Sequence, residues 1–194
     1  MTVSDWPTGK YGAILADPPW HYQTWGKHSG TRHATMHYDT MTIEEIKALP
    51  VEDLAADDCV LFLWMVDWMP PLDVHEIIEA WGFTYKTIAF VWAKTTKDGT
   101  RYPIGLGQWT RANPESCILA TRGTPKRVGR DVRKLLVAPR REHSRKPDEV
   151  YSRIERLVPG PYVELFGRQA WAGWDVWGND TEKFGDDDQE RLAF

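Results

Sequence analysis

The sequence has few cysteines, no long apolar run and no strong excess of charge of either sign. Only two of its 194 residues are cysteines, Cys59 and Cys117, and their spacing fits no zinc pattern. Each lies in an apolar run, so we expect buried, reduced thiols and no metal centre, which favours a cytoplasmic protein. No apolar segment is long enough to span a bilayer. The first residues, MTVSDWPTGKYG, lack the basic and apolar regions of a signal peptide.

The net charge of −4 gives no overall attraction to nucleic acid or to a membrane, so any basic binding surface must be local. Hydrophobic residues make up 42% of the chain, which is enough for a full core at this length. We expect a single domain over residues 1–180 and an acidic, frayed tail over residues 181–194.

Apolar runs and helical stripes alternate along the chain. The expected strands are residues 11–16, 60–65, 85–92, 116–121, 135–137 and 162–167, and the expected helices are residues 42–49, 72–81 and 147–157. Thr42 and Glu45 are expected to form a capping box at the start of the first helix. The continuous apolar runs are typical of strands buried on both faces, as in parallel sheets. This order predicts an α/β fold with a mostly parallel sheet, which binds ligands beyond the carboxyl ends of its strands.

The segment ILADPPW places an acid, two prolines and an aromatic residue directly after the first expected strand. Asp17 therefore lies where ligands of such folds bind. Pro18 and Pro19 fix φ and remove two backbone donors, and Pro18 disfavours helical geometry for Asp17. We expect a stiff, extended arm that presents a carboxylate, carbonyl oxygens and the face of Trp20. A turn that merely ends a strand is the plainer interpretation.

Acceptors beside an aromatic ring suit a planar base with an exocyclic amine. The amine of adenine is a poor nucleophile because its lone pair is delocalised into the ring. If the Asp17 carboxylate and the Pro18 carbonyl each accept one N–H, the amine becomes tetrahedral and its lone pair points at an electrophile. Positioning of this kind contributes up to roughly 7–11 kcal/mol and needs no metal.

The DPPW tetrapeptide resembles the signature of the MTA-type family, named after the seventy-kilodalton subunit of the messenger-RNA adenosine methyltransferase. Other blocks resemble the family in the same order: YDTMTIEEI, LFLWM, GQWTRANPESCILATRG, HSRKPDEVYSRIERLVPG, VELFGR and GWDVWGN. The resemblance covers most of residues 11–180. It implies a Rossmann-like methyltransferase fold with helices on both faces and the permuted β-class motif order. The implied reaction transfers a methyl group from S-adenosylmethionine to the N6 amine of adenine.

The resemblance also assigns roles to matching residues. The positions similar to the family's acceptor site are Asp17, Pro18, Pro19, Trp20, Tyr38, Trp109 and Glu115. Those similar to its cofactor site are Asp17, Lys146, Glu164, Arg168 and Asn179. The chemistry agrees, because a strand-end acid can accept both ribose hydroxyls and an arginine is a fixed fork of donors. Without the resemblance, a solvated lysine, a surface ion pair and a turn asparagine would be the plainer interpretation of Lys146, Arg168 and Asn179.

Two positions depart from the family pattern. Ala170 and Trp171 stand where the messenger-RNA enzyme supplies a histidine and an asparagine to the cofactor. We therefore expect the cofactor ribose to be held differently in this chain.

Residues 121–146 are locally basic, with ten Lys or Arg residues against two acids. Such a stretch can neutralise phosphates in a salt-dependent way. Because it reaches Lys146, we expect it to adjoin the active site and to bind nucleic acid. A solvated loop that balances acids elsewhere is the alternative. The predicted contacts are Lys126, Arg127, Arg130, Arg133, Lys134, Arg140 and Arg141.

Two loops are predicted to close over the target base. Residues 21–38 carry four histidines without the spacing of a metal site, and residues 97–109 are rich in glycine. The target amine must leave any stacked helix, so base flipping or a single-stranded substrate is required. We expect DNA as the substrate, with RNA as the alternative, and a protein that is a monomer or a homodimer. A catalytically silent nucleic-acid-binding subunit, or a methyltransferase for small molecules or protein glutamine, are the competing functions.

Overall fold

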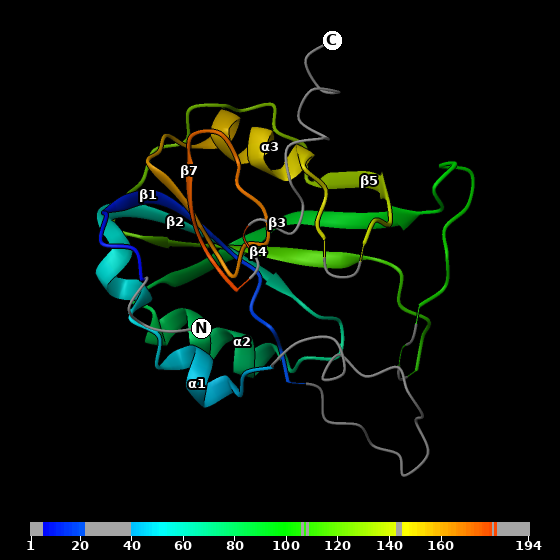
Figure 1. Ribbon diagram of the computed structural model, residues 1–194, viewed down its shortest axis with the longest axis horizontal. Helices are drawn as coiled ribbons and strands as arrows, with labels where there is room; N and C mark the ends of the chain where they lie inside the picture. The colour runs from blue at the N-terminus through cyan, green and yellow to red at the C-terminus, as the bar shows by residue number, and fades with distance from the viewer. Residues whose placement is uncertain are drawn as a thin grey trace.

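A computed structural model describes residues 6–21, 40–105, 107, 109–142, 145–179 and 181, and Figure 1 shows its arrangement. Seven strands form one sheet in the order β5-β3-β4-β2-β1-β6-β7. The strands are β1 (Tyr11–Ala16), β2 (Ala55–Met65), β3 (Thr84–Thr95), β4 (Glu115–Arg122), β5 (Leu135–Pro139), β6 (Tyr162–Leu165) and β7 (Trp174–Trp177). The helices are α1 (Ile43–Lys47), the 3-10 helix η3 (Val51–Leu54), α2 (Pro71–Ala80) and α3 (Glu149–Leu157).

The sheet is mostly parallel, which confirms the predicted α/β, Rossmann-like class. β1 is parallel to β2 and β6, β6 is parallel to β7, and β3 is parallel to β5. β4 alone among these strands is reversed, because it pairs antiparallel with both β2 and β3. We call the end of the sheet where the six codirectional strands finish the carboxyl end, and the opposite end the amino end.

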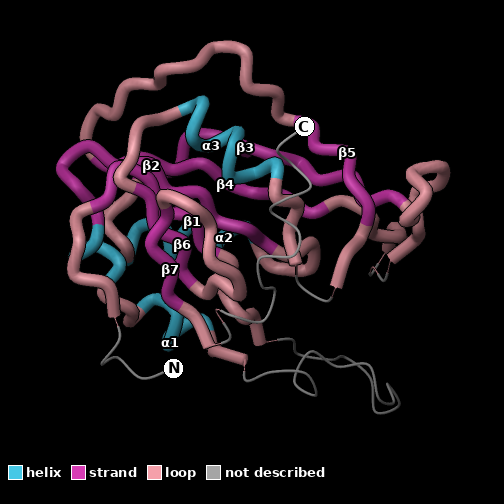
Figure 2. Tube along the Cα trace, turned by 45° about the horizontal axis from the view of Figure 1, so that its top comes forward, coloured by secondary structure: helices cyan, strands magenta, loops and turns pink. Residues whose placement is uncertain are grey.

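Helices cover both faces of the sheet, as Figures 1 and 2 show. α1 and α2 pack on one face and α3 on the other. Side chains of β1 alternate between the two cores, with Ile14 in the cluster under α2 and Leu15 in the cluster under α3. Both sides of the central strands are therefore buried, which explains why their sequences are continuous apolar runs.

Local sequence signals account for the ends of the helices. Thr42 and Glu45 form the expected capping box at the start of α1, with the Thr42 side chain accepting from the Glu45 N–H at 3.2 Å. Gly82 follows α2 with a φ of +78°, a conformation that ends a helix and that glycine adopts at little cost. The indole N–H of Trp81 donates to the Ile46 carbonyl at 3.0 Å and joins the two helices.

Two features differ from the expectations. β2 begins at Ala55, earlier than the predicted residue 60, because Tyr11 pairs with Ala55 across a register shift although the segment between carries two aspartates. The short strand β7 was not predicted, because four residues of WDVW give too little periodicity. Cys59 and Cys117 are buried free thiols, as expected.

Two absences apply to the part of the chain that the structure describes. No helix in it is long and apolar enough to cross a membrane. No group of three His, Cys, Asp or Glu side chains in it could hold a metal ion. Most of the predicted loop at residues 21–38 and, apart from Thr181, the predicted tail at residues 181–194 lie outside the described residues.

Candidate active site at the carboxyl end of the sheet

The carboxyl end of the sheet brings together chemically active residues from distant parts of the sequence. Asp17 follows β1 directly, and Lys146 lies in the connection from β5 to α3. Glu115 is the first residue of β4, and it lies at this end because β4 runs opposite to its neighbours. The reversed direction of β4 thus places its first residue, an acid, in the site.

The DPPW arm is held by backbone hydrogen bonds along its length. The Asp17 N–H donates to the Leu165 carbonyl at 3.4 Å, and the Met41 N–H donates to the Pro19 carbonyl at 2.8 Å. The Trp20 N–H donates to the Pro18 carbonyl at 2.9 Å, so one lone pair of that oxygen is already used. The arm is fixed as expected, but Pro18 has only its second lone pair to offer an amine.

Trp20 lies in the hydrophobic core, and only 6% of its surface is exposed. It packs in the cluster under α1 and α2, and its indole N–H has no hydrogen-bond partner among the described residues. The structure therefore does not place its ring face open to a ligand. Stacking of Trp20 on a base stays a prediction, whereas its role in packing the arm against the core is evident.

Four charged side chains of alternating sign form a chain across the site. Lys146 Nζ lies 2.5 Å from Asp17 Oδ2 and 3.4 Å from Glu115 Oε2. The other carboxylate oxygen of Glu115 lies 2.5 Å from Lys94 Nζ. Lys146 also lies 5.4 Å from the ring centroid of Trp64, which contributes a cation–π contact. The Lys146 ammonium thus joins the strand-end acid of β1 to the first acid of β4.

Burial and pairing compete in setting the pKa values of this chain. Burial alone would lower the pKa of Lys146, but the carboxylates of Asp17 and Glu115 more than offset it and raise this pKa. Burial raises the pKa of Asp17, and Lys146 only partly opposes the rise. For Glu115, burial is outweighed by the ammonium groups of Lys146 and Lys94, so its pKa is lowered. Lys146 stays protonated at neutral pH and can hold Asp17 in a fixed orientation.

A second network surrounds Glu164 on β6. The Tyr151 hydroxyl donates to Glu164 Oε2 at 2.8 Å, and the Gln169 amide donates to Tyr151 Oη at 3.3 Å and to Asp148 Oδ1 at 3.1 Å. Burial raises the pKa of Glu164 to about 8, although the Tyr151 hydrogen bond opposes the rise. Glu164 Oε1 has no hydrogen-bond partner among the described residues, so one carboxylate oxygen can accept from a ligand.

Trp171, one of the two departures from the family pattern, stacks on Tyr151 with ring centroids 4.5 Å apart and an interplanar angle of 9°. Where the resemblance implies a polar contact to the cofactor, this chain instead has an aromatic residue that packs on the tyrosine supporting Glu164. The departure therefore adds to the packing around the tyrosine that binds Glu164.

The residues around Glu164 fit S-adenosylmethionine. Side chains pack closely against Gly167 there, because a Cβ placed on this glycine would lie 2.9 Å from Glu164 Oε2 and 2.4 Å from Val176 Cγ2. A strand-end acid with a free oxygen suits ribose hydroxyls. The Arg168 guanidinium lies close enough to act electrostatically on Asp17, and Asn179 is exposed just beyond β7. The cofactor roles of Lys146, Glu164, Arg168 and Asn179 stay predictions that this donor set suits.

The predicted acceptor residues outside this centre are placed unequally. Glu115 belongs to the charge chain, whereas Trp109 lies on the β3–β4 connection with 99% of its surface exposed. Tyr38 lies outside the described residues. A role for Trp109 as a contact to the acceptor therefore depends on a ligand reaching out to this connection.

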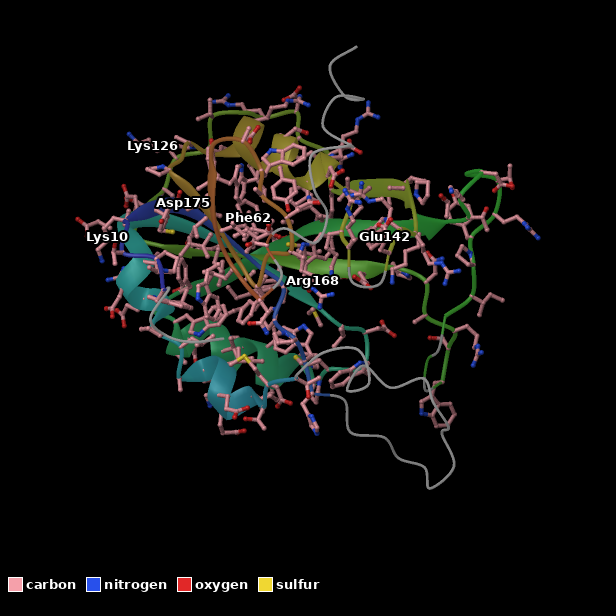
Figure 3. All side chains as sticks on the ribbon, in the orientation of Figure 1. Lys10, Phe62, Lys126, Glu142, Arg168 and Asp175 are labelled. Atoms are coloured by element: carbon pink, nitrogen blue, oxygen red, sulfur yellow. The ribbon has the colours of Figure 1, made fainter. Side chains whose placement is uncertain are left out.

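The expectation that the whole basic stretch adjoins the active site is wrong. β4 runs toward the amino end, so the connection that follows it begins there with Gly123. The connection then returns toward the carboxyl end, because the carbonyl of its last residue, Lys134, accepts the Val91 N–H at 3.0 Å and Val91 pairs with Ser116. The Val128 N–H donates to the carbonyl of Leu157, the last residue of α3, at 2.8 Å. Figure 3 shows Lys126 at the left of the molecule and Glu142 to the right of its centre. The predicted contacts at the amino end are Lys126, Arg127 and Arg130, whereas Arg133 and Lys134 lie where the connection returns to β5.

Arg140 and Arg141 follow β5 and lie at the carboxyl end. Arg140 is exposed, but the Arg141 guanidinium binds both carboxylate oxygens of Asp148 and donates to the Lys146 carbonyl at 3.1 Å. Arg141 therefore fixes the backbone that carries Lys146. Its guanidinium is already bound within the protein, and phosphate binding by Arg141 stays an untested prediction.

Sequence reasoning missed three functional residues: Lys94, Tyr151 and Gln169. Lys94 lies near the end of β3, and Tyr151 lies within α3. The Asn113 amide pairs with the Lys94 backbone in both directions, at 3.1 and 2.9 Å, and so places the lysine next to Glu115. Only the reversed direction of β4 could have revealed that Lys94 and Glu115 meet.

Comparison with known proteins shows which proteins the chain is similar to. Residues 11–180 match the MT-A70 family. A type II methyltransferase, M.MunI, from Mycoplasma sp is 34% identical over 190 residues, which cover 89% of this chain and 78% of that protein. The N(6)-adenosine-methyltransferase MT-A70-like protein of Arabidopsis thaliana is 35% identical over 177 residues, 88% of this chain and 24% of that protein. The human N(6)-adenosine-methyltransferase catalytic subunit METTL3 is 32% identical over 179 residues, 90% of this chain and 29% of that protein.

Proposed function

The chain belongs to the MT-A70 family, which makes it an S-adenosylmethionine-dependent adenine N6-methyltransferase, and we propose that its substrate is adenine in DNA. The share of each relative's length that the chain covers supports this choice. The chain spans 78% of the type II methyltransferase but only about a quarter of the plant and human relatives named for adenosine. We take the type II designation of the relative of similar size as a pointer to DNA.

The charge chain from Asp17 to Glu115 is the observation that carries the mechanism. Lys146 holds one oxygen of Asp17, which leaves Oδ1 to accept a hydrogen bond from the adenine amine. The second lone pair of the Pro18 carbonyl accepts the other N–H. Both contacts replace hydrogen bonds that the amine would otherwise donate to water, and they direct its lone pair away from the arm.

S-adenosylmethionine, when bound, supplies an electrophilic methyl group on a sulfonium. Glu164 would accept its ribose hydroxyls, with Arg168 and Asn179 beside it, and the backbone before α3 would face its carboxylate. The proton that the alkylated amine gives up passes to the Asp17 carboxylate or to water. Burial raises the pKa of Asp17, so this carboxylate is a better proton acceptor than an exposed aspartate.

Matched oligonucleotides test the choice of DNA. Labelled S-adenosylmethionine is incubated with one adenine-containing sequence prepared as single- and double-stranded DNA and as single- and double-stranded RNA, and initial rates of label transfer are compared. We expect DNA to be labelled faster than RNA at equal concentration. Faster labelling of RNA would overturn the DNA assignment and favour the function named for the plant and human relatives.

A further inference from the structure

The segment from Gly123 to Arg130, which we call the amino-end loop, carries three basic residues. Lys126, Arg127 and Arg130 are exposed and have no ion-pair or hydrogen-bond partner among the described residues. Two of the acids nearby are already engaged. Asp131 lies 2.5 Å from Arg156, and the Asp58 carboxylate accepts the Thr124 N–H at 2.7 Å.

The amino-end loop is anchored on the protein at several points. Its backbone is bound through Thr124 to β2 and through Val128 to the last residue of α3. A Cβ on Gly129 would lie 2.3 Å from the Arg156 carbonyl oxygen, so the loop lies directly against the end of α3. In Figures 1 and 2 the connection from β4 to β5 passes over the face that α3 covers. Because the backbone of the loop is already held, only its exposed side chains need to be ordered when they bind an anion.

The loop is too far from the active site to touch the target base. β4 alone separates Glu115 at the carboxyl end from Arg122 at the amino end, and eight extended residues span about 23 Å. Along DNA this distance corresponds to roughly 7 base pairs, because each strand carries one phosphate per ~3.4 Å. A substrate bound at the active site can therefore bring a flanking segment of its backbone to the loop.

We propose that the amino-end loop is a remote anchor for the phosphate backbone of the DNA molecule whose adenine occupies the active site. This inference rests on the proposed function. The anchor increases affinity for substrates long enough to reach it and has no part in methyl transfer. It assigns the loop cations to binding of flanking DNA, away from the reacting base.

Substrate length tests the anchor. Two DNA substrates share one central adenine, one with about 4 and the other with about 15 flanking nucleotides on each side, so that only the longer one spans the ~7 base pairs to the loop. The triple variant Lys126→Gln, Arg127→Gln, Arg130→Gln removes exposed charges that have no partner in the described part of the chain. Lys134 is left in place because its ammonium reaches the Thr87 hydroxyl at 3.5 Å.

In the triple variant, the KM and the equilibrium Kd for the long substrate should rise on the order of 10-fold at low salt, and the salt slope should fall by about 2 to 3. The short substrate should keep its KM, and kcat should stay the same for both. A charge-matched control, Lys97→Gln, Arg101→Gln, Arg111→Gln, removes exposed cations from the β3–β4 connection at the carboxyl end. Any effect of that control should be the same for both lengths.

Equal losses for the short and long substrates in the triple variant would overturn the anchor, and so would unchanged affinity for both. Failure of the proposed function has a different signature, because no DNA of either length would then be methylated by the wild-type protein. The Kd measurements decide the anchor in that case too, since they need no turnover.

Discussion

At the carboxyl end of the sheet, the charged groups of Asp17, Glu115 and Lys146 are half-buried and pair with one another. At the amino end, Lys126 and Arg130 are exposed and pair with no acid among the described residues. Paired charges in a partly dry site are costly to assemble and are fixed in orientation, which suits positioning of a reacting group. Exposed, unpaired cations cost little and suit binding of phosphates. We therefore propose that one end of the sheet carries out the chemistry and that the other end binds the flanking substrate.

The direction of β4 produces this separation. Because the strand is reversed, it begins with Glu115 in the charge chain and is followed at the other end by the basic connection. If β4 were parallel to its neighbours, Glu115 would lie at the amino end and the basic connection would begin at the carboxyl end. Variants at the carboxyl end should therefore lose turnover, whereas variants at the amino end should lose affinity for DNA.

Replacing Asp17 by Ala should lower kcat by about 10³-fold or more, because the amine loses its main acceptor and its orientation. Binding of S-adenosylmethionine, measured by calorimetry, should be largely unchanged. Single-turnover rates at saturating DNA, compared with those of the triple variant of the amino-end loop, separate the two ends of the sheet. Near-normal turnover by the Asp17→Ala protein would refute the role of Asp17.

Replacing Lys146 by Met should destabilise the protein by about 3–5 kcal/mol, because it leaves two half-buried carboxylates facing each other. Replacing Lys94 by Met should cost less, since Glu115 keeps its contact with Lys146. Chemical denaturation of both variants measures the difference. A larger loss for Lys94→Met would show that the chain is centred on Glu115 and Lys94.

The pH dependence of cofactor binding should reveal Glu164. Its pKa is raised to about 8 by burial, and only the ionised carboxylate can accept two ribose hydroxyls, so affinity should rise as pH increases through about 8. In Tyr151→Phe the midpoint should move upward, because the hydroxyl that favours the ionised form is lost. Glu164 also responds to Asp17, Lys146 and Asp148, so calorimetric titrations of Glu164→Gln, expected to be flat, provide the control.

The same group affects stability with a defined sign. A carboxyl group with a raised folded pKa contributes stability that is fully present below about 4.5 and is lost as pH rises through about 8. The free energy of unfolding of the cofactor-free protein should therefore decline over this range. In Glu164→Gln the decline should be smaller, and an identical decline would assign the effect to other groups.

Replacing Trp109 by Ala should have the smallest effect. Its ring is almost fully exposed, so the free energy of unfolding should change by less than about 0.5 kcal/mol. If the ring stacks on a nucleotide, the KM for DNA should rise on the order of 5-fold. An unchanged KM would remove Trp109 from the acceptor site.

Much of the fold could be predicted because its signals are local. The apolar run of β1 and the capping box at Thr42 depend on neighbouring residues only, and both are present as predicted. The start of β2 and the strand β7 depend on pairing with distant strands, which no local pattern reports.

The candidate site was predictable to a similar extent. The resemblance named Asp17, Glu115 and Lys146, and the structure brings them together. The partnership of Lys94 with Glu115 and the remote position of the amino-end loop follow from the direction of a single strand. Lys126 and Lys146 therefore lie at opposite ends of the sheet, although they belong to the same basic stretch of the sequence.

Product analysis tests the central claim most directly. DNA incubated with the protein and S-adenosylmethionine carrying a labelled methyl group is digested to nucleosides and separated by mass spectrometry. Orientation of the adenine amine by Asp17 predicts that the label appears in N6-methyladenine alone. Label on a ring nitrogen or on the cytosine amine, or no label in any nucleoside, would contradict the account.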